Sequence, residues 1–145
     1  MKKFTKILAL TLVVIMSVLT LVACATPAKE PKDAKKALED NDYTVSLTEL
    51  DEATDDGEIA MLSAYNKDGE YIMIVWYEDA KSAKESYNDL KEELKEQEED
   101  LEESKDDLGD EAYEEAKEAL DKIVIGKSGK MVWMASSKDA VKAAK

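Results

Sequence analysis

The sequence contains no histidine and no arginine, and it has a single cysteine. Without histidine, the chain lacks the side chain that most often moves protons near neutral pH and that most often binds zinc. Without arginine, it lacks the side chain that reads phosphate groups in a bidentate manner. One cysteine cannot form a disulfide within the chain. These absences exclude a histidine-dependent enzyme and a fold held together by internal disulfides.

Positive charge is also scarce. The 20 basic residues, all lysine, stand against 34 acidic residues, so the 145-residue chain has a formal net charge of -14. Nucleic-acid binding depends on basic side chains that displace counterions from the phosphates, and a strongly negative protein is repelled by them. We therefore expect no nucleic acid among the partners.

Motifs for catalysis, metal binding or cofactor binding are weak. Aligning the glycine of an EF-hand loop with Gly57 places Ser63 where that loop needs its last glutamate. The segment Gly126-Lys127-Ser128 is similar to the end of a phosphate-binding loop, but Asp121 stands where its first glycine belongs. No Gly-x-Ser-x-Gly nucleophile motif is present. We predict no catalytic residue, no cofactor and no dedicated metal site.

The first 23 residues have the pattern of a secretory signal peptide. Lys2, Lys3 and Lys6 give it a positive start, and residues 7–22 are apolar apart from two threonines and one serine. A transmembrane anchor and a secreted protein with a free thiol are the alternatives. The first is less well supported, because residues 7–23 are at the short limit for crossing a bilayer.

The segment Leu21-Val22-Ala23-Cys24 resembles the lipobox of bacterial lipoproteins. The resemblance covers the signal peptide and Cys24 only, and it implies that Cys24 is acylated and becomes the first residue of the mature protein. Two or more acyl chains anchor a protein stably. The resemblance therefore implies a cell-membrane lipoprotein held on the extracytoplasmic side. Loss of three lysines with the signal leaves 17 lysines against 34 acids, and anionic lipid would repel so acidic a domain.

The mature chain is predicted to contain one tether and one domain. Residues 24–31 include both prolines and no periodic apolar pattern, which is typical of a tether. Residues 32–145 suit a single domain with one core. Within it, residues 96–111 contain ten acids and one lysine, which predicts an acidic helical insertion. A solvated helix tip is the favoured interpretation of this segment over weak calcium binding or attraction of a basic partner.

The apolar periodicity predicts an α+β fold, with a mostly antiparallel five-stranded sheet and helices packed on one face. The expected order is α-β-β-β-α-α-β-β-α. A helix from Pro31 precedes a strand from Tyr43 with one polar face, and Asp68-Gly69 predicts a hairpin between strands 58–65 and 71–77. Helices 79–107 and 110–122 follow, separated at Gly109, with one unbroken helix as the alternative. Strands 123–127 and 130–135 precede a final helix that a Ser136/Asp139 capping box would begin.

The strand at 71–77 is apolar on both faces and is therefore predicted to lie inside the sheet. Trp76 and Trp133 are expected on the face that the helices cover. If the opposite face is bare, it would display the alternating side chains of that strand as a possible binding face, because exposed apolar patches mark interaction sites. Those side chains are Tyr71, Met73, Val75 and Tyr77. Simple filling of the core by these side chains is the alternative.

Together these features predict a membrane-anchored extracytoplasmic lipoprotein that acts as a non-catalytic binding module of the cell envelope. Its candidate partners are the membrane, through the lipid on Cys24, and an envelope protein, a peptide or a cell-wall component. The alternative is a structural or stress-related envelope protein that associates with itself through its acidic helical hairpin.

Overall fold

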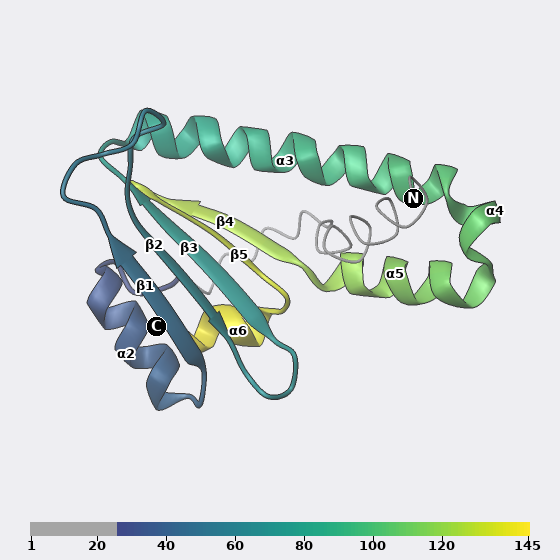
Figure 1. Cartoon of the computed structure of the whole chain (residues 1–145), viewed down its shortest axis with the longest axis horizontal. Coiled ribbons are helices and arrows are strands. Elements are labelled where there is room, and N and C mark those ends of the chain that lie inside the picture. Colours follow the sequence, from purple (N-terminus) through teal and green to yellow (C-terminus); the bar gives the residue numbers. More distant parts are fainter. Residues whose placement is uncertain (1–25) are drawn as a thin grey trace.

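The computed structural model describes residues 26–145 (Figure 1). The predicted signal peptide and Cys24 lie outside the described residues. The elements, in chain order, are α2 (Pro31–Asp40), β1 (Thr44–Glu49), β2 (Glu58–Tyr65), β3 (Tyr71–Tyr77), α3 (Ala80–Glu103), α4 (Lys105–Leu108), α5 (Asp110–Lys122), β4 (Val124–Ser128), β5 (Met131–Ala135) and α6 (Lys138–Ala143).

The five strands form one antiparallel sheet in the order β1-β2-β3-β5-β4, which confirms the predicted α+β class and order of elements. The strand that is apolar on both faces, β3, lies at the centre, as predicted. The β2–β3 hairpin turns through Gly69, whose positive φ of 82° suits a residue without a Cβ. β1 and β4 are the two edges of the sheet.

Helices cover both faces of the sheet, whereas the sequence pattern predicts helices on one face. α2 and α6 pack on one face, where Leu38 and Val141 join the largest core cluster with Ile74. α3 packs on the other face, where Ala83 contacts the cluster of Val75 and Tyr77. The reason is that β3 and β5 present apolar side chains on both sides, so the second face must also be buried. The expectation of one covered face is therefore wrong.

The predicted helical hairpin is confirmed, with its turn at Gly109. Gly109 has a φ of 78°, which ends the helical path before α5 begins. Leu94 and Leu101 of α3 pack against Tyr113 and Leu120 of α5. The Tyr113 hydroxyl also donates a hydrogen bond to the Glu102 carboxylate. The apolar stripes of the hairpin therefore face each other, and its outward surface is acidic. Figure 1 shows the hairpin extending beyond the sheet.

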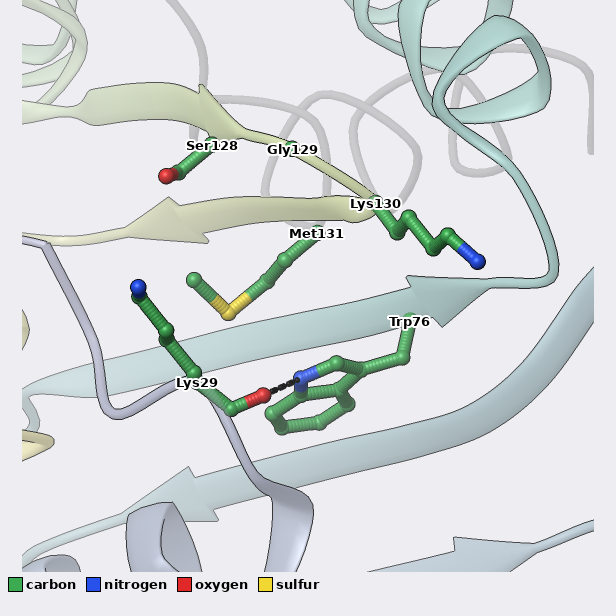
Figure 2. A pocket seen from close by; sticks show the side chains of 6 residues that line it. All are labelled: Lys29, Trp76, Ser128, Gly129, Lys130 and Met131. Carbon is green, nitrogen blue, oxygen red and sulfur yellow. Dashed lines mark hydrogen bonds between the residues drawn. The ribbon is translucent and has the colours of Figure 1, made fainter.

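The sequence pattern predicts a tether at residues 24–31. In the structure, the described part of this segment, before α2, instead packs on the domain. Pro27 is buried. The Ala28 amide donates to the Ala144 carbonyl at 2.7 Å, and the Trp76 indole nitrogen donates to the Lys29 carbonyl at 2.8 Å (Figure 2). A segment with small side chains can lie close to the core, and its backbone groups then find partners there.

Salt is expected to stabilise the hairpin. Acidic side chains lie one helical turn apart in α3 at positions 96/100, 98/102 and 99/103. In this stretch, one attractive pair, Lys95 with Glu99 at 3.8 Å, opposes their repulsion. Because salt screens such repulsion, raising NaCl from about 0.05 M to about 1 M should increase the melting temperature by about 2–5 °C. Circular dichroism at the helical minimum measures this. The double variant Glu96→Gln/Asp100→Asn should gain less, and an equal gain would contradict the explanation.

Candidate functional site

The four side chains of the predicted binding face do share one side of the sheet, but α3 covers two of them. Val75 is 9% exposed and Tyr77 is 3% exposed. The Tyr77 hydroxyl donates to the Ser86 hydroxyl of α3 at 2.6 Å, and this bond holds the helix on the strand. Val75 and Tyr77 therefore cannot serve as an exposed binding face, and that part of the prediction is wrong. Tyr71 is half-buried and Met73 is exposed.

Both tryptophans lie on the opposite side of the sheet, within the cluster that α2 and α6 cover, as predicted. Trp76 is 5% exposed and Trp133 is 6% exposed. Trp133 stands directly across from Gly126 of the edge strand β4. The two indoles are therefore components of the core.

An uncharged surface lies where α3 does not cover the sheet, and we call it the open face. It combines β1, β2 and the middle of β3 in matched register: Ser46 pairs with Ser63, and Ser63 pairs with Met73. Directly opposite residues in a sheet share one face. The exposed members of the open face are Thr44, Ser46, Thr48, Met61, Ser63, Tyr65 and Met73.

The open face differs from the rest of the molecule in composition. None of its exposed side chains is charged, although 37% of the residues of the chain are. Met61, Tyr65 and Met73 are 41%, 60% and 38% exposed, so apolar area is available to a partner. Met73 could be predicted from the sequence, but Met61 and Tyr65 could not, because their place beside it depends on the pairing of β2 with β3.

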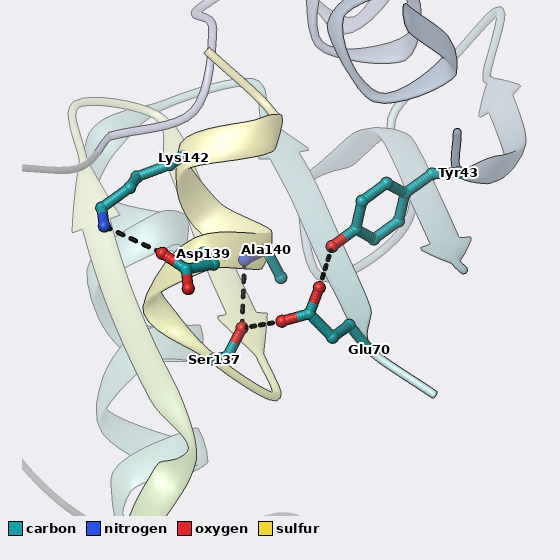
Figure 3. A network of polar contacts seen from close by, with 6 residues as sticks. All are labelled: Tyr43, Glu70, Ser137, Asp139, Ala140 and Lys142. Atoms are coloured by element: carbon teal, nitrogen blue, oxygen red, sulfur yellow. Dashed lines mark hydrogen bonds and ion pairs between the residues drawn. The ribbon is translucent and has the colours of Figure 1, made fainter. Parts of the chain in front are cut away.

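A polar network ties the β2–β3 turn to distant segments (Figure 3). The Glu70 carboxylate accepts hydrogen bonds from the hydroxyls of Ser137, at 2.6 Å, and Tyr43, at 2.9 Å, and from the Asn66 amide, at 3.1 Å. The bond from Ser137 is the main reason that the pKa of Glu70 lies below its usual value. Burial, and then the bond to Glu70, raises the pKa of Tyr43. A carboxylate with a lowered pKa is a poor general base, so the network suits a structural role.

The start of the final helix differs from the prediction by one residue. The final helix is capped by Ser137 and not by Ser136, because the Ser137 hydroxyl accepts the Ala140 amide at 3.1 Å. Ser136 instead accepts the Tyr71 amide at 2.9 Å. Two adjacent serines compete for the cap position, and the contact with Glu70 favours the second.

A small pocket lies where the N-terminal segment docks on the sheet (Figure 2). It has a volume of about 290 Å³ and is lined by Lys29, Trp76 and residues 128–131. The ammonium of Lys130 donates to the Glu78 carbonyl at 2.8 Å, so this charge is already paired with a backbone group. The pocket holds no acid, base and nucleophile in contact, and it offers no arrangement for catalysis.

A second, polar pocket of about 520 Å³ lies between the start of α3 and the residues that precede β2. Acidic side chains dominate its lining, including Asp56, Glu58 and Asp89. Among residues 26–145, no group of three or more acidic or cysteine side chains is placed to hold a metal ion. Nor is any helix within those residues both long and apolar enough to cross a membrane.

Comparison with protein families, with curated proteins and with solved structures found no match for this chain.

Proposed function

We propose that this protein is a lipid-anchored, extracytoplasmic lipoprotein that acts as a non-catalytic binding module of the cell envelope. Cys24 is the site of lipid attachment, and the membrane is its first partner. The second partner is an envelope protein, a peptide or a cell-wall component. The open face carries this proposal, because an uncharged surface in so acidic a chain is the place where a partner can be bound without burying unpaired charges.

The side chains of the open face suit recognition by surface contact. Met61 and Met73 are flexible and apolar, and Tyr65 combines a large apolar ring with a polar hydroxyl. The neighbouring Ser46 and Ser63 offer hydroxyls that donate and accept hydrogen bonds. Methionine and tyrosine are both enriched in protein interfaces, whereas acidic residues and lysine are depleted there.

The docked N-terminal segment supports a position close to the membrane. Pro27 is buried, so only Ala25 and Thr26 lie between the proposed lipid site and the first buried residue of the domain. The three steps along the chain from Cys24 to Pro27 span about 10 Å at most. A domain held so closely would meet partners at the membrane surface.

Lipidation is tested by expressing the full chain in a bacterial host and by fractionating the cells. We expect the protein in the membrane fraction, with acyl chains on Cys24 detected by intact-mass spectrometry. A Cys24→Ala variant should lose the lipid. A wild-type chain that carries no lipid on this thiol would contradict the anchor.

The binding role is tested by photo-crosslinking in the same cells. A photoreactive amino acid at Met61 probes the open face, and one at the exposed Glu115 of α5 is the matched control. We expect adducts of defined mass from position 61 and not from position 115. Identical adduct patterns at both positions, or none at position 61, would contradict the use of the open face.

A further inference from the structure

β1 is an edge strand whose central residues carry none of the side chains that commonly prevent pairing with another chain. Its sequence from Thr44 to Thr48 contains no proline, no lysine and no bulge. The other edge, β4, includes Gly126 and Lys127. Charged side chains, lysine above all, and irregular backbone are common devices that block an edge. Among the described residues, only β2 pairs with β1, so its outer side is unpaired.

The backbone groups available on that outer side follow from the register. The Leu50 amide donates to the carbonyl of Ile59 in β2 at 2.9 Å, and these two residues continue the register of the β1–β2 pairs. Backbone groups alternate in direction along an antiparallel strand. The amides of Thr44, Ser46 and Thr48 therefore point toward β2, and those of Val45, Leu47 and Glu49 point outward. Three donors and three acceptors are thus available to an added strand.

The charges around β1 define the chemistry of a complementary strand. The central residues 44–48 are uncharged, and acids stand at both ends. Asp40 and Asp42 are exposed before the strand, and Asp51 and Glu52 are exposed after it. Beside the strand, Lys32 lies 3.5 Å from Glu49, so it compensates for one acid of the edge. The ends of the edge are therefore negative and its centre is neutral.

From these features we infer that β1 accepts an extended segment of a basic partner protein as a sixth strand. That segment has an uncharged centre of about five residues and lysine or arginine at both ends, and its backbone bonds to Val45, Leu47 and Glu49. The added strand enlarges the open face beside Thr44, Ser46 and Thr48. This inference rests on the proposed binding function and specifies the class of partner and the manner of its recognition.

A second copy of this chain fits the edge less well. Its own β1 is uncharged at the centre, but it brings acids at both ends into contact with acids. The whole domain has the same sign, since residues 26–145 contain 17 lysines and all 34 acids of the chain. Opposite charges both strengthen and accelerate association, and like charges oppose it.

The probe for the test is the synthetic peptide KKTVSVTKK, added to the chain without its signal peptide and with Cys24→Ser. Amide hydrogen exchange is followed residue by residue by nuclear magnetic resonance. At a peptide concentration of about ten times the dissociation constant, exchange of the outward amides should slow about tenfold. The amides of Ser46 and Thr48 are internal controls, because they bond to β2 with or without peptide.

Two control peptides separate the parts of the inference. EETVSVTEE keeps the strand-forming centre and reverses the ends, and it should bind at least about tenfold more weakly at low salt. A version of the lysine peptide that is N-methylated at alternate residues of its centre keeps the charge and loses the backbone donors. It should give no protection at Val45, Leu47 and Glu49.

Three results would overturn the inference. They are equal binding of the two charge forms, peptide-induced changes confined to the acidic hairpin, and outward amides that are already protected by self-association in the free protein. The last result would assign the edge to a second copy. If the peptide experiment fails but photo-crosslinking gives specific adducts at Met61, the proposed binding function stands without the strand-addition mode. Absence of lipid on Cys24 would instead remove the anchor without affecting the exchange result.

Discussion

Replacing Gly126 with alanine is expected to lower the free energy of unfolding by about 2–3 kcal/mol, as overpacking of a well-filled core does. A Cβ at this position would overlap the indole ring of Trp133, which lies over Gly126 from the neighbouring strand. Trp133 is 6% exposed and is surrounded by the main core cluster, so it has little space to move. Either the indole leaves its position or β4 separates from β5. Denaturation in urea measures the loss, and tryptophan emission should shift to longer wavelength.

Gly129→Ala is the matched control for that experiment. It lies in the turn of the same hairpin, and nothing is within 4 Å of the added Cβ. Its φ of 57° costs an alanine about 1–2 kcal/mol, with no overlap of side chains. Tryptophan emission should stay unchanged in this variant. A Gly126→Ala protein with unchanged emission, and with a smaller loss of stability than the control, would contradict the packing of Trp133 on β4.

Replacing Glu70 with glutamine is expected to lower the free energy of unfolding at neutral pH by about 2 kcal/mol. This figure reflects the loss of hydrogen bonds to a charged group, reduced because the carboxylate is partly exposed. The carboxylate accepts bonds from Tyr43, Asn66 and Ser137, whereas an amide nitrogen would point donors at donors. The loss should affect the α2–β1 junction, the β2–β3 turn and the start of α6 together.

The effect of Glu70 should depend on pH, with a defined sign. Its folded-state pKa is lower than the ordinary value of 4.5, so the folded protein binds this proton more weakly than the unfolded chain does. The stabilisation is therefore fully present above the unfolded-state pKa and is lost as pH falls from about 5.5 through 4.5 and below the folded-state value. The stability difference between wild type and Glu70→Gln should shrink over this interval. Taking the difference removes the contribution of the other carboxylates.

Asp68→Asn provides the control in the same turn. Its side chain is exposed and accepts no hydrogen bond among the described contacts, while its backbone amide bonds to Asn66. We expect a change of less than about 0.5 kcal/mol at neutral pH. A loss as large as that of Glu70→Gln would show that any change in this turn destabilises the protein, and it would refute the role of the network.

The strands and the hairpin turns could be predicted because their signals are local. The alternation from Tyr43 to Thr48 predicts a strand with one polar face, and β1 has that face in the structure. Gly69, Gly109 and Gly129 mark turns because their positive φ values suit a residue without a side chain. Each of these signals is contained within a few neighbouring residues.

The covered and open parts of the second sheet face could not be predicted in the same way. Whether Val75 and Tyr77 are exposed depends on where α3 lies, and the helix stripe with Ala83 fits either face of the sheet. The register that brings Met61 and Met73 onto one surface also depends on pairing between strands. The Glu70 network joins residues that are 27 and 67 positions apart, so no window of sequence contains it.

The hydrogen bond between Ala28 and Ala144 brings the two ends of the described fold into contact. The backbone is therefore almost a closed loop, and the order in which its segments follow one another along the chain can be changed without changing their arrangement. A short glycine-rich connector from Lys145 to Thr26, with new termini in the exposed turn at Gly129, gives a circular permutant that keeps all five strands. In such a permutant, β5 comes first and β4 comes last.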